Sequence, residues 1–317
     1  MADKSSTAYT PPMTLTGFIE EFARYFSGSN QLKCYRGQRD SSWPIVAGIF
    51  RPEHKDLLKD EKIAVRKLIS VQPHEFASDE TMFDKLVRMQ HFGLPTRLLD
   101  VSRNALVALF FATDPGPADS RPSDGMVTAF AIPDQLVKHY DSDSVSCIAN
   151  LANMTSEEKD DIYRSIERRC RLRESLSEDT SDAWHIRKFN KDGVVERLLQ
   201  FIRTEKPYFQ SIMDPIDLFV PYYVHPKMSN RRILAQSGAF ILYGFVPPKT
   251  MFFPYVIEEK QFIVPQSKKS SIREDLANIG INESTLFPEI DKAANSIRKE
   301  YMTKQEMFEK ELAIASM

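Results

Sequence analysis

The chain has 317 residues, of which 42% are hydrophobic and 27% are charged, a composition typical of a globular protein rather than a disordered one. Its 42 basic and 44 acidic residues give a formal net charge of −2, which excludes a global positive field that would attract nucleic acid or an anionic membrane. A nucleic-acid site would therefore have to be a local patch.

Cysteine and histidine spacing bears on compartment and metal binding. The three cysteines, Cys34, Cys147 and Cys170, are far apart and form no C-x-x-C pair, which argues against a disulfide framework and a zinc site. The six histidines show no H-x-x-H or H-E-x-x-H spacing, so no metal is expected. No window approaches the roughly 18 apolar residues of a membrane span, and the N-terminus lacks an apolar signal segment. We expect a cytoplasmic protein with no membrane partner.

In chain order, residues 1–13 predict a polar tail, and 14–317 a single domain. Apolar residues at helical spacing in "TLTGFIEEFARYFS" predict a helix with Thr16 as its N-cap. A short strand follows over residues 32–35, ending at Arg36 and Gly37.

Two charged, amphipathic helices are predicted over residues 53–71 and 78–91, and "GLP" at 93–95 ends the second. The polar stretch "GLPTRLLDVS" at 93–102 is then expected as a loop at a helix C-terminus. "SRNALVALFFATD" predicts a buried helix with Ser102 as N-cap, and "DGMVTAFAIP" predicts a strand.

Residues 134–206 are helix-rich and highly charged, and resemble an insertion more than core. Strand-like runs return in "DLFVPYYVHP", "RRILAQSGAFILYGFVP" and "KQFIVP", before two helices flanking "GINESTLFP". Helices and strands without a repeat or a Gly/Ser linker predict one α+β domain with a helical insertion at about 134–206.

Three stretches carry candidate binding chemistry: "YRGQ" at 35–38, "GLPTRLLDVS" at 93–102 and "RRILAQSGAF" at 231–240. Each places polar groups and a glycine beside an element end, where a backbone can approach a ligand closely. Arg36 offers a planar fork suited to a phosphate, and Gly37 leaves room for a flat ring against main-chain amides. The structural alternative for Arg36 is a buried salt bridge, for instance with Asp100.

The other polar residues also have structural alternatives. Thr96 and Ser102 could cap helices, Asp100 could hold Arg97, and His91 could satisfy the end of its helix. Gln236 is harder to explain structurally, because an amide inside an apolar run either finds a partner across a sheet or points into a cleft.

A nucleic-acid surface has one source of support, an arginine cluster between residues 164 and 173. Glu167, Glu174, Glu178 and Asp179 interleave with these arginines, which favours a solvated, ion-paired helix.

The chain resembles the FRG domain family, named for an aromatic-Arg-Gly signature. The resemblance rests on "YRGQ" with Trp43-Pro44, "QHFGLPTRLLDVSRNALVALFFA", "DGMVTAF", "RRILAQSGAFIL" and "GINESTLFPEID", and covers roughly residues 15–295. It implies a domain rather than a defined activity.

The motif order is also similar to that of ADP-ribosyltransferases, which face an NAD⁺ cleft with an Arg-Gly strand, a Thr/Ser-bearing element and a late Gln/Glu-bearing element. This second resemblance implies an ADP-ribosyltransferase-like mixed or antiparallel sheet core with flanking helices. It implies that Arg36 holds a phosphate or the ribose, that Gly37 amides bind the nicotinamide carboxamide, and that Tyr35, Phe92 or Phe240 stacks on the ring. The implied catalytic residues are Arg36, Gln236, Thr96 and Asp100, and the implied cofactor-binding residues are Tyr35, Gly37, Gln38, His91, Arg97, Ser102 and Phe240.

One departure from that pattern concerns turnover. Cleavage of NAD⁺ needs negative charge near an oxocarbenium-like ribose, and Gln236 offers a neutral amide where efficient transferases usually carry Glu. Asp100 is then the nearest acidic alternative.

Three functions remain open at this stage. The first is an NAD⁺-consuming mono-ADP-ribosyltransferase or glycohydrolase with a protein or nucleic-acid acceptor, in a setting of bacterial or phage toxin or antiviral conflict. The second is a non-catalytic nucleotide- or NAD-sensing module, which the missing glutamate favours. The third is a nucleic-acid-binding protein.

Overall fold

The computed structural model describes residues 13–117, 119–175, 182–228, 230–247, 255–288 and 301. Within these residues, seven strands form one mixed sheet in the order β4-β5-β6-β2-β1-β3-β7, and all neighbours are antiparallel except the parallel pair β4 and β5. The strands are β1 Leu32–Gln38, β2 Leu98–Ser102, β3 Gly125–Ile132, β4 Val137–His139, β5 Tyr222–His225, β6 Gly238–Leu242 and β7 Glu258–Val264. The predicted α+β class and mixed sheet are confirmed.

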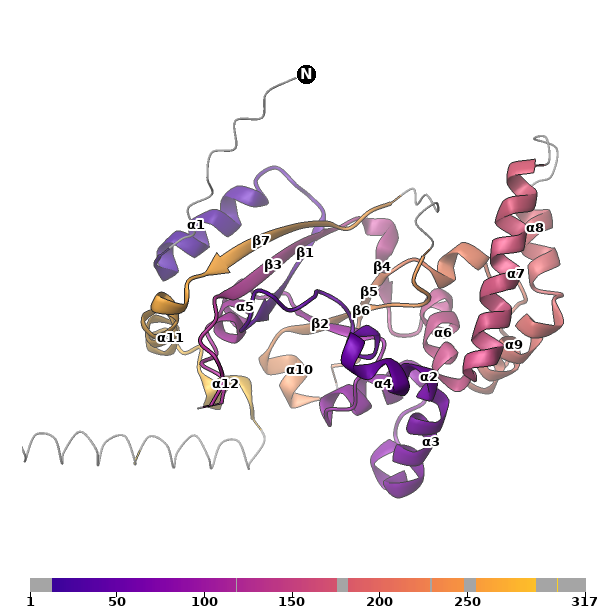
Figure 1. The fold of residues 1–317 in the computed structure, drawn as a ribbon, viewed down its shortest axis with the longest axis horizontal. Helices are drawn as coiled ribbons and strands as arrows, with labels where there is room; N and C mark the ends of the chain where they lie inside the picture. Colours follow the sequence, from indigo (N-terminus) through magenta and orange to yellow (C-terminus); the bar gives the residue numbers. More distant parts are fainter. Residues whose placement is uncertain are drawn as a thin grey trace, which may run out of the picture.

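Helices cover the sheet and extend beyond it (Figure 1). Helices α1 and α11 lie near β7 at one end of the molecule, and α7, α8 and α9 stand together at the other. The helices are α1 Leu15–Tyr25, α2 Lys55–Lys59, α3 Glu61–Val71, α4 Met82–His91, α5 Ala105–Ala112, α6 Asp143–Ala149, α7 Ser156–Ser175, α8 Asp182–Phe189, α9 Gly193–Glu205, α10 Arg231–Ala235, α11 Lys269–Asn278 and α12 Glu283–Leu286.

Helix α1 begins two residues earlier than its predicted cap. Thr14, not Thr16, is the N-cap, because its backbone is extended and its hydroxyl accepts from Gly17 N at 3.1 Å. Phe18 and Phe22 then lie one turn apart on the buried face. Strand β1 is longer than predicted and includes residues 36–38.

The polar stretch after α4 is not a loop throughout, as the sequence predicted. Helix α4 ends at His91, as predicted, and Gly93 follows two residues later with a φ of +87°. Residues 98–102 instead form β2, which pairs with β6 along its whole length and buries all its residues except Asp100. Ser102 therefore ends a strand, and Asn104 caps α5 by accepting from Leu106 N at 2.9 Å.

Three other predicted elements differ in detail. Residues 53–71 break at Asp60 between α2 and α3. Residues 231–235, predicted within a strand-like run, form the short helix α10 before β6. The connection predicted in "GINESTLFP" contains α12, and the helix expected after it lies outside the described residues.

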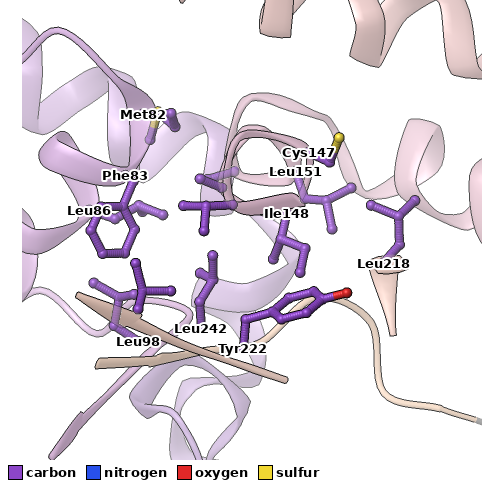
Figure 2. Packing of buried hydrophobic residues seen from close by; sticks show 14 of the residues in the cluster. Met82, Phe83, Leu86, Leu98, Cys147, Ile148, Leu151, Leu218, Tyr222 and Leu242 are labelled. Atoms are coloured by element: carbon purple, nitrogen blue, oxygen red, sulfur yellow. The ribbon is translucent and has the colours of Figure 1, made fainter. Parts of the chain in front are cut away.

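The core has two parts, one on each face of the sheet. Side chains alternate along β1 and β3, so Tyr35 and Ala129 pack with α1, α5 and α11, whereas Cys34 and Phe130 pack with the larger cluster on the opposite face. Figure 2 shows how this larger cluster joins side chains of α4, such as Phe83 and Leu86, to those of α6 and β6.

The region 134–206 is largely helical, as predicted, and it is not peripheral to the core. Fully or almost fully buried side chains from α6, α7, α8 and α9 belong to the larger cluster; they include Cys147, Ile148, Ile162, Phe189 and Leu198. The region therefore contributes side chains to the core, and its assignment as an insertion stays a prediction.

Candidate functional site

The sheet opens between its two central strands. β1 and β2 pair only at Tyr35 and Ser102, whereas β1 pairs with β3 along its whole length and β2 does the same with β6. A cavity of about 250 Å³ lies at this opening, between β1, β2 and β6 and the helices α4, α5 and α10. We call it the sheet cleft. The predicted site residues that line it are Tyr35, Arg36, Gly37, His91, Asp100, Ser102, Gln236 and Phe240.

Arg36 bridges the opening between the strands. Its Nη1 donates to the main-chain oxygen of Asp100 at 2.8 Å and lies 3.9 Å from the Asp100 carboxylate. Its Nε is buried and has no hydrogen-bond partner. Burial lowers the pKa of Arg36; the charge of Arg51 acts in the same direction, and Asp100 opposes it. The salt bridge considered from the sequence is thus a long contact, and the guanidinium retains unused donors.

Asp100 is the one carboxylate among the described residues that line the cleft. Its side chain is 56% exposed, and its Oδ2 accepts from Gln90 Nε2 at 2.8 Å. Gln90 is held in turn by Thr96, whose hydroxyl donates to Gln90 Oε1 at 2.9 Å. Thr96 is buried and does not line the cleft, so its place is behind the site, where it orients Gln90.

Arg97 does not reach the cleft. Its side chain is 2% exposed and donates to both carboxylate oxygens of Glu61, at 2.7 and 2.6 Å, and to Gly244 O at 2.8 Å. Lys159 donates to the same carboxylate at 2.7 Å. The interpretation of Arg97 as a cofactor-binding residue is wrong, because its side chain lies in the core and not at the cleft. There it ties the start of β2 to α3 and, through Glu61, to α7.

Gln38 also lies outside the cleft lining. It is buried, and its Nε2 donates to the main-chain oxygens of Asp40 at 3.1 Å and Trp43 at 2.7 Å. It therefore shapes the turn after β1 rather than contacting the cavity.

The space beside Gly37 is already occupied. A Cβ built on Gly37 would lie 1.7 Å from Ala108 O, because the backbone of α5 passes directly over β1 at this point. Although Gly37 lines the cleft, the missing side chain admits a helix and not the flat ring that we expected there.

Gln236 lies at the cleft in a turn between α10 and β6. Its Nε2 donates to Leu286 O at 3.0 Å, and its main-chain oxygen accepts from the Ser102 hydroxyl at 2.7 Å. Ser237, next in the chain, has a φ of 47°, the one left-handed non-glycine residue in the described part of the chain. Such conformations persist only where surrounding contacts hold them, so this turn has a fixed shape. The hydrogen bond from the Ser102 hydroxyl is one of these contacts, so this hydroxyl is already used within the protein.

The aromatic residues expected to stack on a ligand are held in the core or lie elsewhere. Tyr35 packs against Phe22 and Phe26 with ring centroids 5.6 and 5.7 Å apart, and Phe240 packs against Phe83 at 6.2 Å. Phe92 is 60% exposed and does not line the cleft.

The sequence analysis missed several cleft residues, of which Phe111 and Arg232 have the most informative chemistry. Arg232 lies over the ring of Phe287 at 4.9 Å, and that ring meets Phe111 edge-on at 6.0 Å. The doublet "RR" at 231–232 was a usable signal, but it was assigned to a strand.

A second cavity of about 670 Å³ continues from the cleft. The two share Val87, His91, Asn230, Arg232 and Ile233. We call this second cavity the outer groove.

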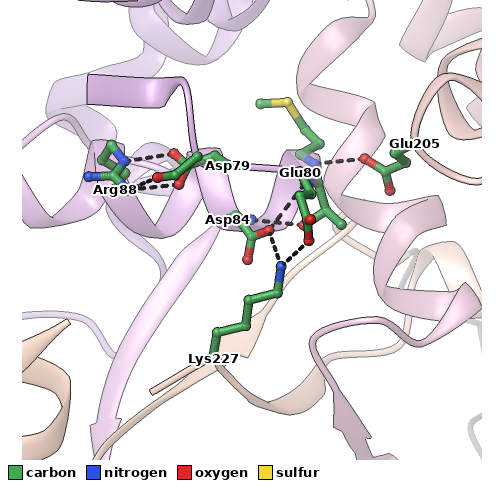
Figure 3. Close-up of polar contacts among 9 residues, drawn as sticks. Asp79, Glu80, Asp84, Arg88, Glu205 and Lys227 are labelled. Carbon is green, nitrogen blue, oxygen red and sulfur yellow. Dashed lines mark hydrogen bonds and ion pairs between the residues drawn. The ribbon is translucent and has the colours of Figure 1, made fainter. Parts of the chain in front are cut away.

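Much of the polar lining of the outer groove is already paired (Figure 3). Arg88 contacts Asp79 at 2.7 Å, and Lys227 contacts Asp84 at 3.1 Å and Glu80 at 2.7 Å. Arg232 lies at the junction of the two cavities; it contacts the ring of Phe287, and no ion pair of its guanidinium is found within the described residues.

The structure gives little support to a nucleic-acid surface, a metal site or a membrane span. In the arginine cluster on α7, Arg164 pairs with Asp161. The cluster's side chains at residues 169–173 are not among those that the structure describes. Within the described ranges, no group of three or more His, Cys, Asp or Glu side chains is arranged to hold a metal ion. None of the helices described is both long and apolar enough to cross a bilayer.

Comparison with known proteins supports the first resemblance. Residues 31–120 match the model of the FRG domain, which includes β1, β2, α4 and α5. Neither curated proteins nor solved structures give a match. The matched segment supplies Arg36 and Asp100 to the sheet cleft, whereas Gln236 and Arg232 come from outside it. Residues 31–120 of the chain are therefore an FRG domain.

Proposed function

We propose that the sheet cleft binds NAD⁺ and that the protein releases nicotinamide from it, as a mono-ADP-ribosyltransferase or glycohydrolase. The observation that carries this proposal is the convergence of Arg36, Asp100 and Gln236 on one cavity at the opening between β1 and β2. The same three residues stand in the motif order of the ADP-ribosyltransferases.

The charge and extent of the two cavities support a dinucleotide. The cleft lining holds the cations Arg36 and Arg232, one carboxylate and several apolar side chains, which suits an anionic ligand with flat rings. The outer groove continues the cleft past Arg232, so the two cavities together form the extended kind of site that a dinucleotide needs.

In the proposed reaction, the bond between nicotinamide nitrogen and ribose C1′ breaks, and its electron pair leaves with neutral nicotinamide. The resulting oxocarbenium-like ribose is captured by water or by an acceptor nucleophile, which loses its proton. Asp100 is the carboxylate available to stabilise the cation, and Gln236 orients the ribose through its amide.

A second candidate is an NAD-sensing module without turnover. Two features favour it. The Asp100 carboxylate already accepts from Gln90 and lies near Arg36, so its charge is partly balanced within the protein, and Gln236 is neutral. Binding of NAD⁺ that raises the melting temperature without nicotinamide release would identify this module.

Arg36→Ala is expected to weaken NAD⁺ binding at least about tenfold, because a charge-assisted contact to phosphate is lost. Stability should fall by only about 1 kcal/mol, since Arg36 makes one short hydrogen bond, to Asp100 O. Thermal shifts with and without NAD⁺ measure both effects. Arg24→Ala, at an arginine side chain that is 71% exposed on α1, is the matched control and should bind NAD⁺ normally. A large loss of stability with unchanged NAD⁺ affinity would make Arg36 a structural residue.

Gln236→Ala is expected to lower nicotinamide release about tenfold to a hundredfold, because the ribose is no longer held in its reactive orientation. The cost to stability is about 1 kcal/mol, for the hydrogen bond to Leu286 O. Release kinetics and urea unfolding separate the two effects. Gln261→Ala, at an exposed glutamine of β7, is the control. Unchanged release by Gln236→Ala would remove Gln236 from the site.

A further inference from the structure

A third cavity, of about 180 Å³, lies behind the sheet cleft. Arg36, Gln90 and Asp100 line both cavities and so form the partition between them. The rest of the lining comes from the segment before α2, which supplies Gly48, Arg51 and His54, and from the region around Pro95. We call it the rear cavity.

The rear cavity is rich in positive charge. Two guanidinium groups line it, those of Arg36 and Arg51, against the single carboxylate of Asp100. That carboxylate lies 3.9 Å from Arg36 and also accepts from Gln90, and no ion pair of Arg51 is found among the described residues. The two guanidinium groups repel each other and share one carboxylate, so the lining carries a net positive charge that an added anion would balance.

Hydrogen bonding gives a second, independent indication. The Nε atoms of both Arg36 and Arg51 are buried without an acceptor. Buried donors of this kind are rare, and one ordinary explanation is an ion that completes the site. His54 is fixed beside them, because its Nδ1 lies 2.7 Å from Gly48 O, which leaves Nε2 for another partner.

We propose that the rear cavity is a binding site for a phosphate group, held between the guanidinium groups of Arg36 and Arg51 with His54 beside them. Phosphate is the anion whose several oxygens match two planar arginine forks. The proposal does not depend on NAD⁺ cleavage, because Arg51 and His54 line the rear cavity and not the sheet cleft.

The test uses the full chain and inorganic phosphate as the probe, with chloride at equal ionic strength as the reference. Phosphate is expected to raise the melting temperature saturably in the wild type. In Arg51→Gln its affinity should fall at least about tenfold. Arg66→Gln, at an exposed arginine of α3, should respond as the wild type does.

Arg51→Gln also distinguishes binding from a structural role. Since Arg51 forms no ion pair within the described residues and repels Arg36, the variant without phosphate should be at least as stable as the wild type. A clear loss of stability in phosphate-free buffer, or a phosphate response equal to that with chloride, would overturn the proposal. So would an unchanged phosphate response in Arg51→Gln.

Competition between inorganic phosphate and NAD⁺ for binding identifies the source of the phosphate group. If phosphate and NAD⁺ exclude one another in the wild type but not in Arg51→Gln, the rear cavity takes a phosphate of the dinucleotide. If both bind at once, it takes a separate phosphate. Either result supports the site, and neither requires nicotinamide release.

Discussion

Arg97→Met is expected to destabilise the protein by about 3–5 kcal/mol, because it leaves the Glu61 carboxylate buried with only Lys159 to balance it. Methionine keeps much of the buried volume, so most of the loss reports the missing charge and hydrogen bonds. Guanidinium unfolding measures the change. Arg66→Met, at an exposed arginine on α3, should change stability by no more than about 0.5 kcal/mol. A loss below about 1 kcal/mol in Arg97→Met would show that the buried network adds little.

The same variant should show a pH signature. Burial would raise the pKa of Glu61, but Arg97 and Lys159 outweigh it and hold this pKa below its usual value. A carboxylate with a depressed folded pKa adds stability above its unfolded pKa, near 4.3, and loses it as pH falls through the folded value. The difference between wild type and Arg97→Met should therefore be largest above about pH 5 and shrink below about pH 4. A difference that is constant over this range would contradict the assigned charge state of Glu61.

Gly37→Ala is expected to cost about 3 kcal/mol or more, because the new methyl group would collide with α5. Its Cβ would lie 1.7 Å from Ala108 O and 2.6 Å from Ala108 C, both of them backbone atoms that cannot rotate away. Since Ala108 lines the sheet cleft, displacement of α5 should also weaken NAD⁺ binding. Chemical unfolding and an NAD⁺ thermal shift record the two effects.

Gly193→Ala is the matched control for that substitution. Gly193 begins α9, and no atom lies within 4 Å of its built Cβ. Alanine there should stabilise the protein by about 0.5–1 kcal/mol, through the helix and the unfolded chain. If Gly37→Ala were as well tolerated as Gly193→Ala, the close approach of α5 to β1 would be wrong.

The convergence of Arg36, Asp100 and Gln236 was within reach of the sequence, because Arg36 and Gln236 lie close to glycines and Asp100 lies in a polar stretch next to a recognisable apolar run. Motif order then suggested that they share a cavity. The α+β class followed in the same way from alternating helical and strand-like periods.

Roles that depend on distant partners were beyond a single sequence. Arg97 looks like a site residue because it follows Thr96, yet its partner Glu61 comes from α3, and Lys159, which shares that carboxylate, comes from α7. Gly37 is equally compatible with a ligand or a helix backbone against β1, and only the packing of α5 decides between them. Local polarity also concealed β2, whose burial becomes visible only when β6 pairs with it.

Arg51 and His54 could not be predicted as site residues from the sequence. They lie in the segment before α2, which carries no recognisable binding pattern. Their connection to Arg36 arises because this segment folds back against β2, where Ile49 N donates to Thr96 O at 3.1 Å.

Nicotinamide release from NAD⁺ by the purified wild type and Arg36→Ala tests the proposed function most directly. It should be measured alone and with cell protein or nucleic acid as acceptor, beside Arg24→Ala. We expect release by the wild type and Arg24→Ala but not by Arg36→Ala, and dependence on one acceptor would distinguish transfer from hydrolysis. No release under any condition, together with no rise in melting temperature on adding NAD⁺, would contradict both NAD⁺ cleavage and NAD⁺ sensing at the sheet cleft.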